Sequence, residues 1–170
     1  MIRIFTIIIC LTANIVFGQA SFDKFTNHED VNAVIVNKKM FEMMSKVKAD
    51  VNNVEVQKYF DLIKNLDNLK VFVTTNPKVS AEMKSSAENH LKTAGLDELM
   101  QINQNGKNVK IHAKPSTKKS HAKELLMFID GKETILLLLT GDFNLNDVSL
   151  LTDHMNLPGG DDLKKAASKK

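Results

Sequence analysis

The sequence predicts an α+β protein with a mixed sheet of about six strands and amphipathic helices packed mainly on one face of it. Three observations support this class. An apolar hairpin occupies residues 124–143, a second hairpin signal stands at Asn105-Gly106, and a helix start stands at Asn76-Pro77. The helices come mostly before the hairpins, so the order predicts an N-terminal βαβ-like half joined to a C-terminal antiparallel meander.

The central hairpin reads ELLMFI, DGKE and TILLLLTGDF. Asp130-Gly131 predicts a type I′ turn, because both residues tolerate positive φ. Leu125–Ile129 and Ile135–Leu139 are uninterrupted apolar runs. A strand that is apolar on both faces is covered on both faces. The second face therefore needs a cover, and three candidates are the lead-in segment with Phe22 and Phe25, a second helix layer, or a partner molecule.

The elements of the first half follow from local signals. A β-branched run predicts a strand at 31–36. Asn37 then caps a helix whose apolar side holds Met40, Met43, Met44 and Val47. After a turn at 50–53, a second helix is predicted at 54–65 and a second strand at 69–74. Lead-in residues 21–30 are polar apart from their two phenylalanines.

The next helix has the strongest signals in the chain. Asn76 is a cap residue and Pro77 takes the first helical position. Apolar residues then recur every four positions, and Gly95 supplies a C-terminal cap. The apolar positions are Val79, Met83, Ala87 and Leu91.

Strands dominate after Gly95. Residues 98–104 and 107–114 flank Asn105-Gly106, whose two-residue turn places Ile102 opposite Val109 and Met100 opposite Ile111. The other face then carries Leu99, Gln101, Lys110, His112 and Lys114. Beyond the central hairpin, Asn144 caps a last helix that ends at Pro158. Residues 157–170 are predicted to be a basic, disordered tail.

The first twenty residues have the features of a secretory signal peptide. Arg3 is followed by a mostly apolar run at 4–17 and then by Gly18-Gln19-Ala20. Cleavage is expected after Gly18 or Ala20. The run is short for a membrane anchor, which is the alternative interpretation. The expected organisation is a signal at 1–20, one domain at 21–156 and the tail at 157–170. The expected location is the periplasm, with the outer membrane or the exterior as alternatives.

Two residue counts restrict the chemistry of the exported chain. Cys10 is the single cysteine and lies within the signal, so neither an internal disulfide nor a cysteine metal site is expected. Arg3 is the single arginine, so the mature chain has no planar fork for bidentate phosphate binding. With a formal charge of +3, nucleic acid is not an expected partner.

No catalytic, cofactor-binding or metal-binding residue is assigned, and no cofactor is expected. The histidines are scattered and are expected on the surface, although His112 and His121 flank one loop and could meet. Paired carboxylates are read as turn or tail residues, and the Ser/His group as a polar loop. These carboxylates are Asp97, Glu98, Asp142, Asp161 and Asp162, the histidines are His28, His90, His112, His121 and His154, and the loop holds Ser116, Thr117, Ser120 and His121.

Two further groups have both a binding and a structural interpretation. The methionine cluster around Phe41 is an adaptable binding face or part of the core. The lysines contact anionic lipid or polysaccharide, or they form a solvated surface. They are Lys107, Lys110, Lys114, Lys118, Lys119, Lys164, Lys165, Lys169 and Lys170, of which the first three are expected to share a strand face.

Three segments together resemble a known family. They are FDKFTNHEDVNAVIVNKKMFEMM at 22–44, LKVFVTTNPKVSAEM at 69–83 and GKETILLLLTGDFNLNDVSLL at 131–151. They are similar to the domain-of-unknown-function family 4252, whose members are small exported proteins of Gram-negative bacteria, some of them lipoproteins. The resemblance extends over residues 22–156. It implies a cell-envelope location and no assigned activity, and it transfers no catalytic residue.

Three functions remain open on the sequence. The first is a non-enzymatic exported protein that binds a protein or another envelope component. The second is an envelope enzyme with a carboxylate or histidine site, which a concave pocket holding such a pair would favour. The third is lysine-mediated binding to a membrane surface or a polyanion. The oligomeric state is not determined by the sequence.

Overall fold

The computed structural model describes residues 22–46 and 53–168. Its elements are η1 (Asp23–Phe25), β1 (Asn32–Asn37), α1 (Lys38–Met44), α2 (Val54–Lys64), β2 (Leu66–Thr74), α3 (Pro77–Ala94), β3 (Asp97–Gln104), β4 (Lys107–Pro115), β5 (His121–Asp130), β6 (Thr134–Asn144), η2 (Leu145–Asp147), α4 (Ser149–Met155) and α5 (Gly160–Ser168). The predicted signal at 1–20, Val47 and most of the turn at 50–53 lie outside the described residues.

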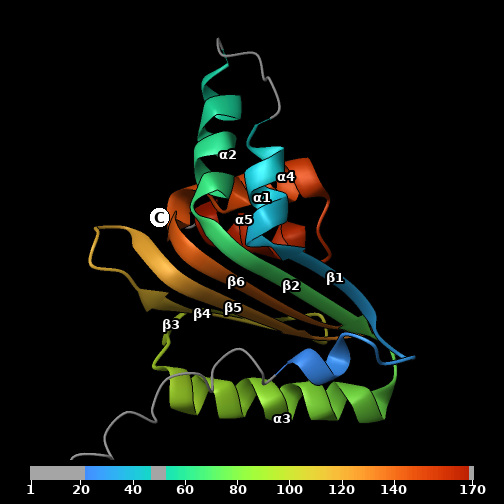
Figure 1. The fold of residues 1–170 in the computed structure, drawn as a ribbon. Coiled ribbons are helices and arrows are strands. Elements are labelled where there is room, and N and C mark those ends of the chain that lie inside the picture. The colour runs from blue at the N-terminus through green and yellow to red at the C-terminus, as the bar shows by residue number, and fades with distance from the viewer. Residues whose placement is uncertain (1–21, 47–52, 169–170) are drawn as a thin grey trace, which may run out of the picture.

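The strands form one six-stranded sheet in the order β1-β2-β6-β5-β4-β3. The α+β class and the strand number are therefore confirmed, but the prediction of a mixed sheet is wrong. Every neighbouring pair is antiparallel, including β1 with β2. The two helices between β1 and β2 form an excursion at one end of the sheet (Figure 1), so the chain returns alongside β1 without the crossover of a βαβ unit.

Helices cover both faces of the sheet, and four of the five α-helices of the described residues lie on one face, in keeping with the expectation that they pack mainly on one. In Figure 1, α1, α2, α4 and α5 lie on one side and η1 with α3 on the other. The buried residues accordingly form two hydrophobic clusters. The first includes Met127 and Leu137, and the second includes Leu126 and Leu138, which alternate with them along β5 and β6. The central hairpin is thus buried on both sides within the chain.

The cover of the second face combines two of the predicted candidates. Phe22 and Phe25 are fully buried, and the Phe25 ring packs edge-on against Phe72 at 5.9 Å. Helix α3 adds Met83, which is also fully buried. The Nζ of Lys70 lies 2.5 Å from Asp23 Oδ1 and attaches η1 to the sheet.

Local signals explain α3 and the tighter of the two hairpins. Asn76 Oδ1 accepts a hydrogen bond from Lys78 N at 2.9 Å, and Gly95 ends the helix at φ +66°. Asn105 and Gly106 both have positive φ, and the pairing of Ile102 with Val109 is confirmed. Gly131, by contrast, is not among the positive-φ glycines, so the predicted type I′ turn is wrong there. Ile129 pairs with Ile135 around a longer loop.

The C-terminal segment is ordered where the sequence predicts disorder. Residues 160–168 form α5, which contacts α4. Leu163 is 4% exposed and belongs to the first hydrophobic cluster. The acidic residues Asp161 and Asp162 occupy the first turn of α5, where a negative charge is favourable.

Gly141 of β6 lies against the backbone at the start of β2. A Cβ there would lie 2.3 Å from the carbonyl oxygen of Asn65. We expect Gly141→Ala to lower the free energy of unfolding by about 1–3 kcal/mol, because backbone must move to accept the methyl group. Urea denaturation followed by circular dichroism measures this change.

The matched control is Gly131→Ala. Its Cβ would meet nothing nearer than Lys107 Cγ at 3.5 Å, and its φ is not positive. We expect a change within about 0.5 kcal/mol. Equal effects of the two substitutions would contradict the assignment of Gly141 to a close backbone contact.

Candidate binding cleft

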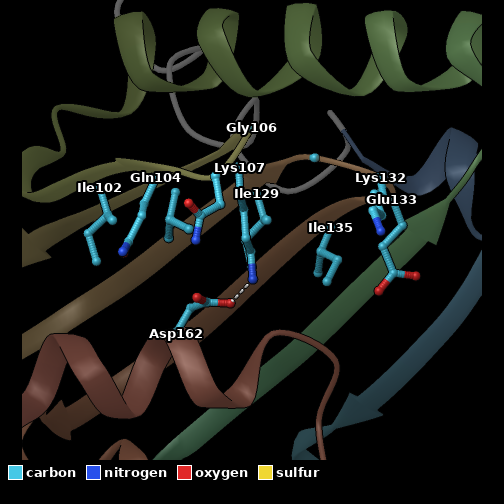
Figure 2. A pocket seen from close by; sticks show the side chains of 12 residues that line it. Ile102, Gln104, Gly106, Lys107, Ile129, Lys132, Glu133, Ile135 and Asp162 are labelled. Atoms are coloured by element: carbon cyan, nitrogen blue, oxygen red, sulfur yellow. Dashed lines mark hydrogen bonds and ion pairs between the residues drawn. The ribbon is translucent and has the colours of Figure 1, made fainter.

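A cleft of about 570 Å³ opens where the β3–β4 and β5–β6 turns meet the first turn of α5. Its apolar floor consists of Ile102, Val109, Ile129 and Ile135. Figure 2 shows Ile102, Ile129 and Ile135 projecting from the sheet toward the helix. This volume is within the range of sites that hold small ligands or single side chains.

An ion pair spans the cleft. Lys107, from the start of β4, extends from the sheet to the carboxylate of Asp162 at the N-terminal end of α5 (Figure 2). The Asp162 side chain is only 9% exposed, whereas that of Lys107 is 43% exposed. The lysine thus compensates the charge of a nearly buried carboxylate while keeping part of its own surface in solvent.

Two glycines allow α5 to pack closely against the sheet and against α4, so that its first turn borders the cleft. A Cβ at Gly159 would lie 2.8 Å from Ile129 Cδ1, and one at Gly160 would lie 2.9 Å from Thr152 Cβ. Gly159 also has φ +78°. Helix α4 ends at Met155, where Asn156 takes a left-handed conformation at φ +47°, so the predicted stop at Pro158 is wrong. The Pro158-Gly159-Gly160 segment instead precedes and positions α5.

A second hollow of about 320 Å³ continues from the cleft around the same ion pair. Both are lined by Lys107, Glu133, Ile135 and Asp162. The rim of the second hollow adds Asp161 and Lys164. The combined surface presents an aliphatic floor surrounded by charges of both signs.

The opposite face of the sheet has a smaller hollow of about 160 Å³, lined by His112 on β4 and by residues of α3. His112 is 8% exposed, and its Nε2 lies 3.7 Å from Glu98 Oε2, too far for a hydrogen bond. Burial lowers the pKa of His112, and the effect outweighs the opposing charge of Glu98. This hollow contains a histidine near a carboxylate, but its volume is below the usual size of a ligand site.

A second histidine–carboxylate pair is buried. His90 Nε2 contacts Glu124 Oε1 and joins α3 to β5. The Phe22 ring lies against His90 with centroids 5.2 Å apart. His90 is 3% exposed, and neither partner lines the three hollows described above. The surface location expected for the histidines is therefore wrong for His90 and His112.

The other histidines make local contacts. His28 Nδ1 accepts from Asp30 N, His121 Nδ1 lies 3.0 Å from the carbonyl oxygen of Lys119, and the ring of His154 packs on Tyr59. His112 pairs with Leu126 in the β4–β5 ladder, so strand adjacency does not bring it to His121. The described residues hold no cluster of three or more metal-ligating side chains.

The polar loop after β4 is attached to Asp142 of β6. Ser116 Oγ donates to Asp142 Oδ1 at 2.9 Å, and the ammonium groups of Lys118 and Lys123 each lie 3.1 Å from Asp142 Oδ2. Ser116 is thus partnered with a carboxylate on β6 rather than with the imidazole of His121. Together these donors hold the pKa of Asp142 down at about 2.

The lysines are distributed over both faces of the sheet. Lys107 lines the cleft together with Val109, whereas Lys110 lines the hollow under α3. The prediction that Lys107 shares a face with Lys110 and Lys114 is therefore wrong. Several of the other lysines are neutralised in ion pairs, as Lys164 is by Asp153. Among the described helices, none combines the length and apolar character needed to cross a membrane.

Sequence reasoning missed the Lys107–Asp162 pair, since 55 positions separate the two residues. A signal was available in GGDDL at 159–163. Flexible glycines followed by two acidic residues and a leucine are typical of a helix start with a buried side. That pattern would have predicted α5 and placed Asp162 at its first turn.

Fold and cleft together define a small three-layer α+β protein with an open, mainly aliphatic cleft at the end of its sheet. A family model, the domain of unknown function DUF4252, matches residues 24–151. The chain belongs to that family, as the sequence resemblance predicted. Separate searches of curated proteins and of solved structures gave no match.

The Asp142 cluster predicts a pH dependence of stability. The pKa of the Asp142 carboxyl group is about 2 in the folded protein against an ordinary 3.8. The ionised carboxylate therefore contributes its full stabilisation above about pH 4. The contribution is lost as the pH falls toward 2. We expect the melting temperature of Asp142→Asn to fall less steeply between pH 4 and pH 2 than that of the wild type. Parallel slopes in thermal melts of the two proteins would contradict this role.

Proposed function

We propose that this protein is a non-enzymatic, exported protein of the cell envelope that binds a partner protein. The partner would place an aliphatic side chain in the cleft between the β3–β4 turn, the β5–β6 turn and α5. The observation that carries the proposal is the cleft itself, with four β-branched side chains beneath a ring of charged groups.

The floor of the cleft favours an aliphatic group. Isoleucine and valine side chains offer apolar contact without hydrogen-bonding atoms, and burying an aliphatic side chain of the partner contributes about 1.5–3 kcal/mol. The floor is built on adjacent strands, as Val109 pairs with Ile129 and Ile129 with Ile135. Its shape is therefore set by the sheet before any ligand arrives.

The rim favours a peptide segment around that side chain. Lys132 and Glu133 line the same cleft as the Lys107–Asp162 pair, so both hydrogen-bond donors and acceptors border the apolar floor. A peptide backbone offers the complementary N–H and C=O groups at short intervals. A purely aliphatic ligand would form no hydrogen bond with these rim groups.

The pairing of Lys107 with Asp162 supports binding over catalysis. A general acid or base has to exchange a proton with a substrate, and a nucleophilic lysine has to be deprotonated. Here the ammonium group of Lys107 and the carboxylate of Asp162 contact each other, so each already has a partner within the chain. The pair acts instead as a fixed polar bridge over the floor.

Site-specific photo-crosslinking tests the proposal. The exposed Gln104 at the rim is replaced by benzoylphenylalanine, and cells that express the full chain are irradiated. We expect a discrete adduct with one envelope protein, identified by mass spectrometry. Gly131→Trp should reduce the yield of this adduct at least about tenfold, because an indole side chain directed toward Lys107 would occupy the space of the partner's side chain.

The matched control is Ser85→Trp, which places the same indole on the exposed side of α3, across the sheet from the cleft. This variant should give the same adduct as the parent protein. Circular dichroism melts of both tryptophan variants check that they fold. An adduct that survives Gly131→Trp, or that both variants lose equally, would rule out the cleft as the binding site.

Export rests on the first twenty residues. The positive Arg3, the apolar run and Gly18-Gln19-Ala20 support removal of this segment during translocation. We expect the cell-envelope fraction to contain a chain that begins at Gln19 or Ser21, as read by mass spectrometry of its N-terminal peptide. A chain recovered from the cytosol with residues 1–20 intact would contradict export.

A further inference from the structure

We infer that the protein forms a two-fold symmetric homodimer through antiparallel pairing of β1 with β1 of a second copy, which joins the two sheets into one. The proposed interface lies at the opposite side of the sheet from the β3–β4 hairpin that borders the cleft, and it is independent of the proposed function. Strand β1 is the free edge of the sheet beside β2, and Figure 1 shows no described element beyond it.

This edge lacks the features that prevent strand pairing. Within Asn32–Asn37 there is no charged residue and no proline, and the register with β2 is continuous without a bulge. Val34 and Ile35 are 42% and 41% exposed. A regular, uncharged, β-branched edge is a template for another strand.

The other edge of the same sheet is protected. Strand β3 begins with Asp97 and Glu98, both exposed, and a bulge between Glu98 and Met100 interrupts its pairing with β4. Charge and bulges are the usual means by which natural sheets block edge-to-edge association. Only one of the two edges is therefore available to a partner strand.

The sequence of β1 is suited to pairing with itself. An antiparallel pair about a two-fold axis normal to the sheet places Ile35 opposite Ile35 of the second copy. Val34 then lies opposite Val36, on the same face of the joined sheet. Aliphatic residues thus meet across the central three positions, and such cross-strand pairs are favourable.

Charge selects a second copy over an unrelated strand. Glu29 and Asp30 precede β1, whereas Lys38 and Lys39 follow it, and all four are exposed, although Lys38 also pairs with Asp67 at 3.0 Å within the chain. Antiparallel self-pairing places the acidic end of each strand beside the basic end of the other. Each end of the interface thus gains opposite charges, and parallel pairing would instead align like charges.

Methionines enlarge the apolar surface beside the strand. Met40 and Met43 of α1, which begins directly after β1, are 49% and 59% exposed, while Phe41 between them is fully buried. The methionine cluster is thus divided, with Phe41 in the core and two flexible thioether side chains outside. Such side chains adapt readily to the surface of a second copy.

Light scattering after size exclusion should give twice the mass of one chain for the full protein. Ile35→Lys places two ammonium groups directly opposite each other and should raise the dimer dissociation constant at least about tenfold. Because Ile35 is 41% exposed, the Ile35→Lys variant should still fold, and its thermal melt at low protein concentration should show a cooperative transition. The matched variant Leu99→Lys on the β3 edge should leave the mass unchanged.

Cross-linking fixes the register. In a Cys10→Ser background, Ile35→Cys should form a disulfide-linked dimer on mild oxidation, since opposing Cα atoms lie about 4.5–5.5 Å apart in an antiparallel ladder. Leu99→Cys should cross-link at least about tenfold more slowly, as only collisions bring two β3 edges together. A monomeric mass at all concentrations, or equal cross-linking rates for the two cysteines, would overturn the dimer. Loss of a different protein partner upon Ile35→Lys, with a monomeric wild type, would overturn it as well.

Discussion

Burial of the β5–β6 hairpin on both faces is the constraint on which the rest of the structure depends. Its side chains alternate between two hydrophobic clusters, so neither face of the central strands can be left in water. The two faces of the sheet are covered by different numbers of helices. One long helix and the short η1 segment cover one side, and four helices cover the other.

The same constraint places the cleft. The four helices on the first face cover the middle of the sheet, while the turn ends of β3–β4 and β5–β6 extend beyond them. There the aliphatic stripe continues past the helices to Ile102 and Ile135. Here the N-terminal turn of α5 and Lys107 lie over the aliphatic side chains. The cleft is therefore the place where apolar side chains continuous with the core are open to solvent.

The sequence predicted correctly those elements whose ends are set by caps and turns within a few residues. The cap at Asn76, the glycine at 95 and the Asn105-Gly106 turn each act within a few residues, and α3 and the β3–β4 register followed from them. The direction of β2 relative to β1 depends on how α1 and α2, which connect the two strands, are placed against the sheet. No local sequence pattern indicates that placement. The Lys107–Asp162 pair likewise joins segments that only the folded sheet brings together.

Apolar periodicity also could not reveal which face each helix covers. Phe22 and Phe25 indicated a role for the lead-in segment, but they are buried against residues far along the chain, Phe22 against His90 and Phe25 against Phe72. The composition of residues 157–170, which is rich in lysine, predicted disorder. The leucine at 163 and the close approach at Gly159 and Gly160 outweigh that composition, because they bury one side of α5.

The strand order has a consequence for the folding pathway. Strands β3 to β6 pair with their neighbours along the chain, and β1 pairs with β2. The β3–β6 half can therefore form by closing short loops, whereas the pairing of β1 with β2 closes over residues 38–65. The β2–β6 ladder alone joins them, and it unites residues 66–74 with residues 134–141. Closing so long a segment carries the largest entropic cost of any pairing in the sheet, so the joining of the two halves is the step that topology makes slowest.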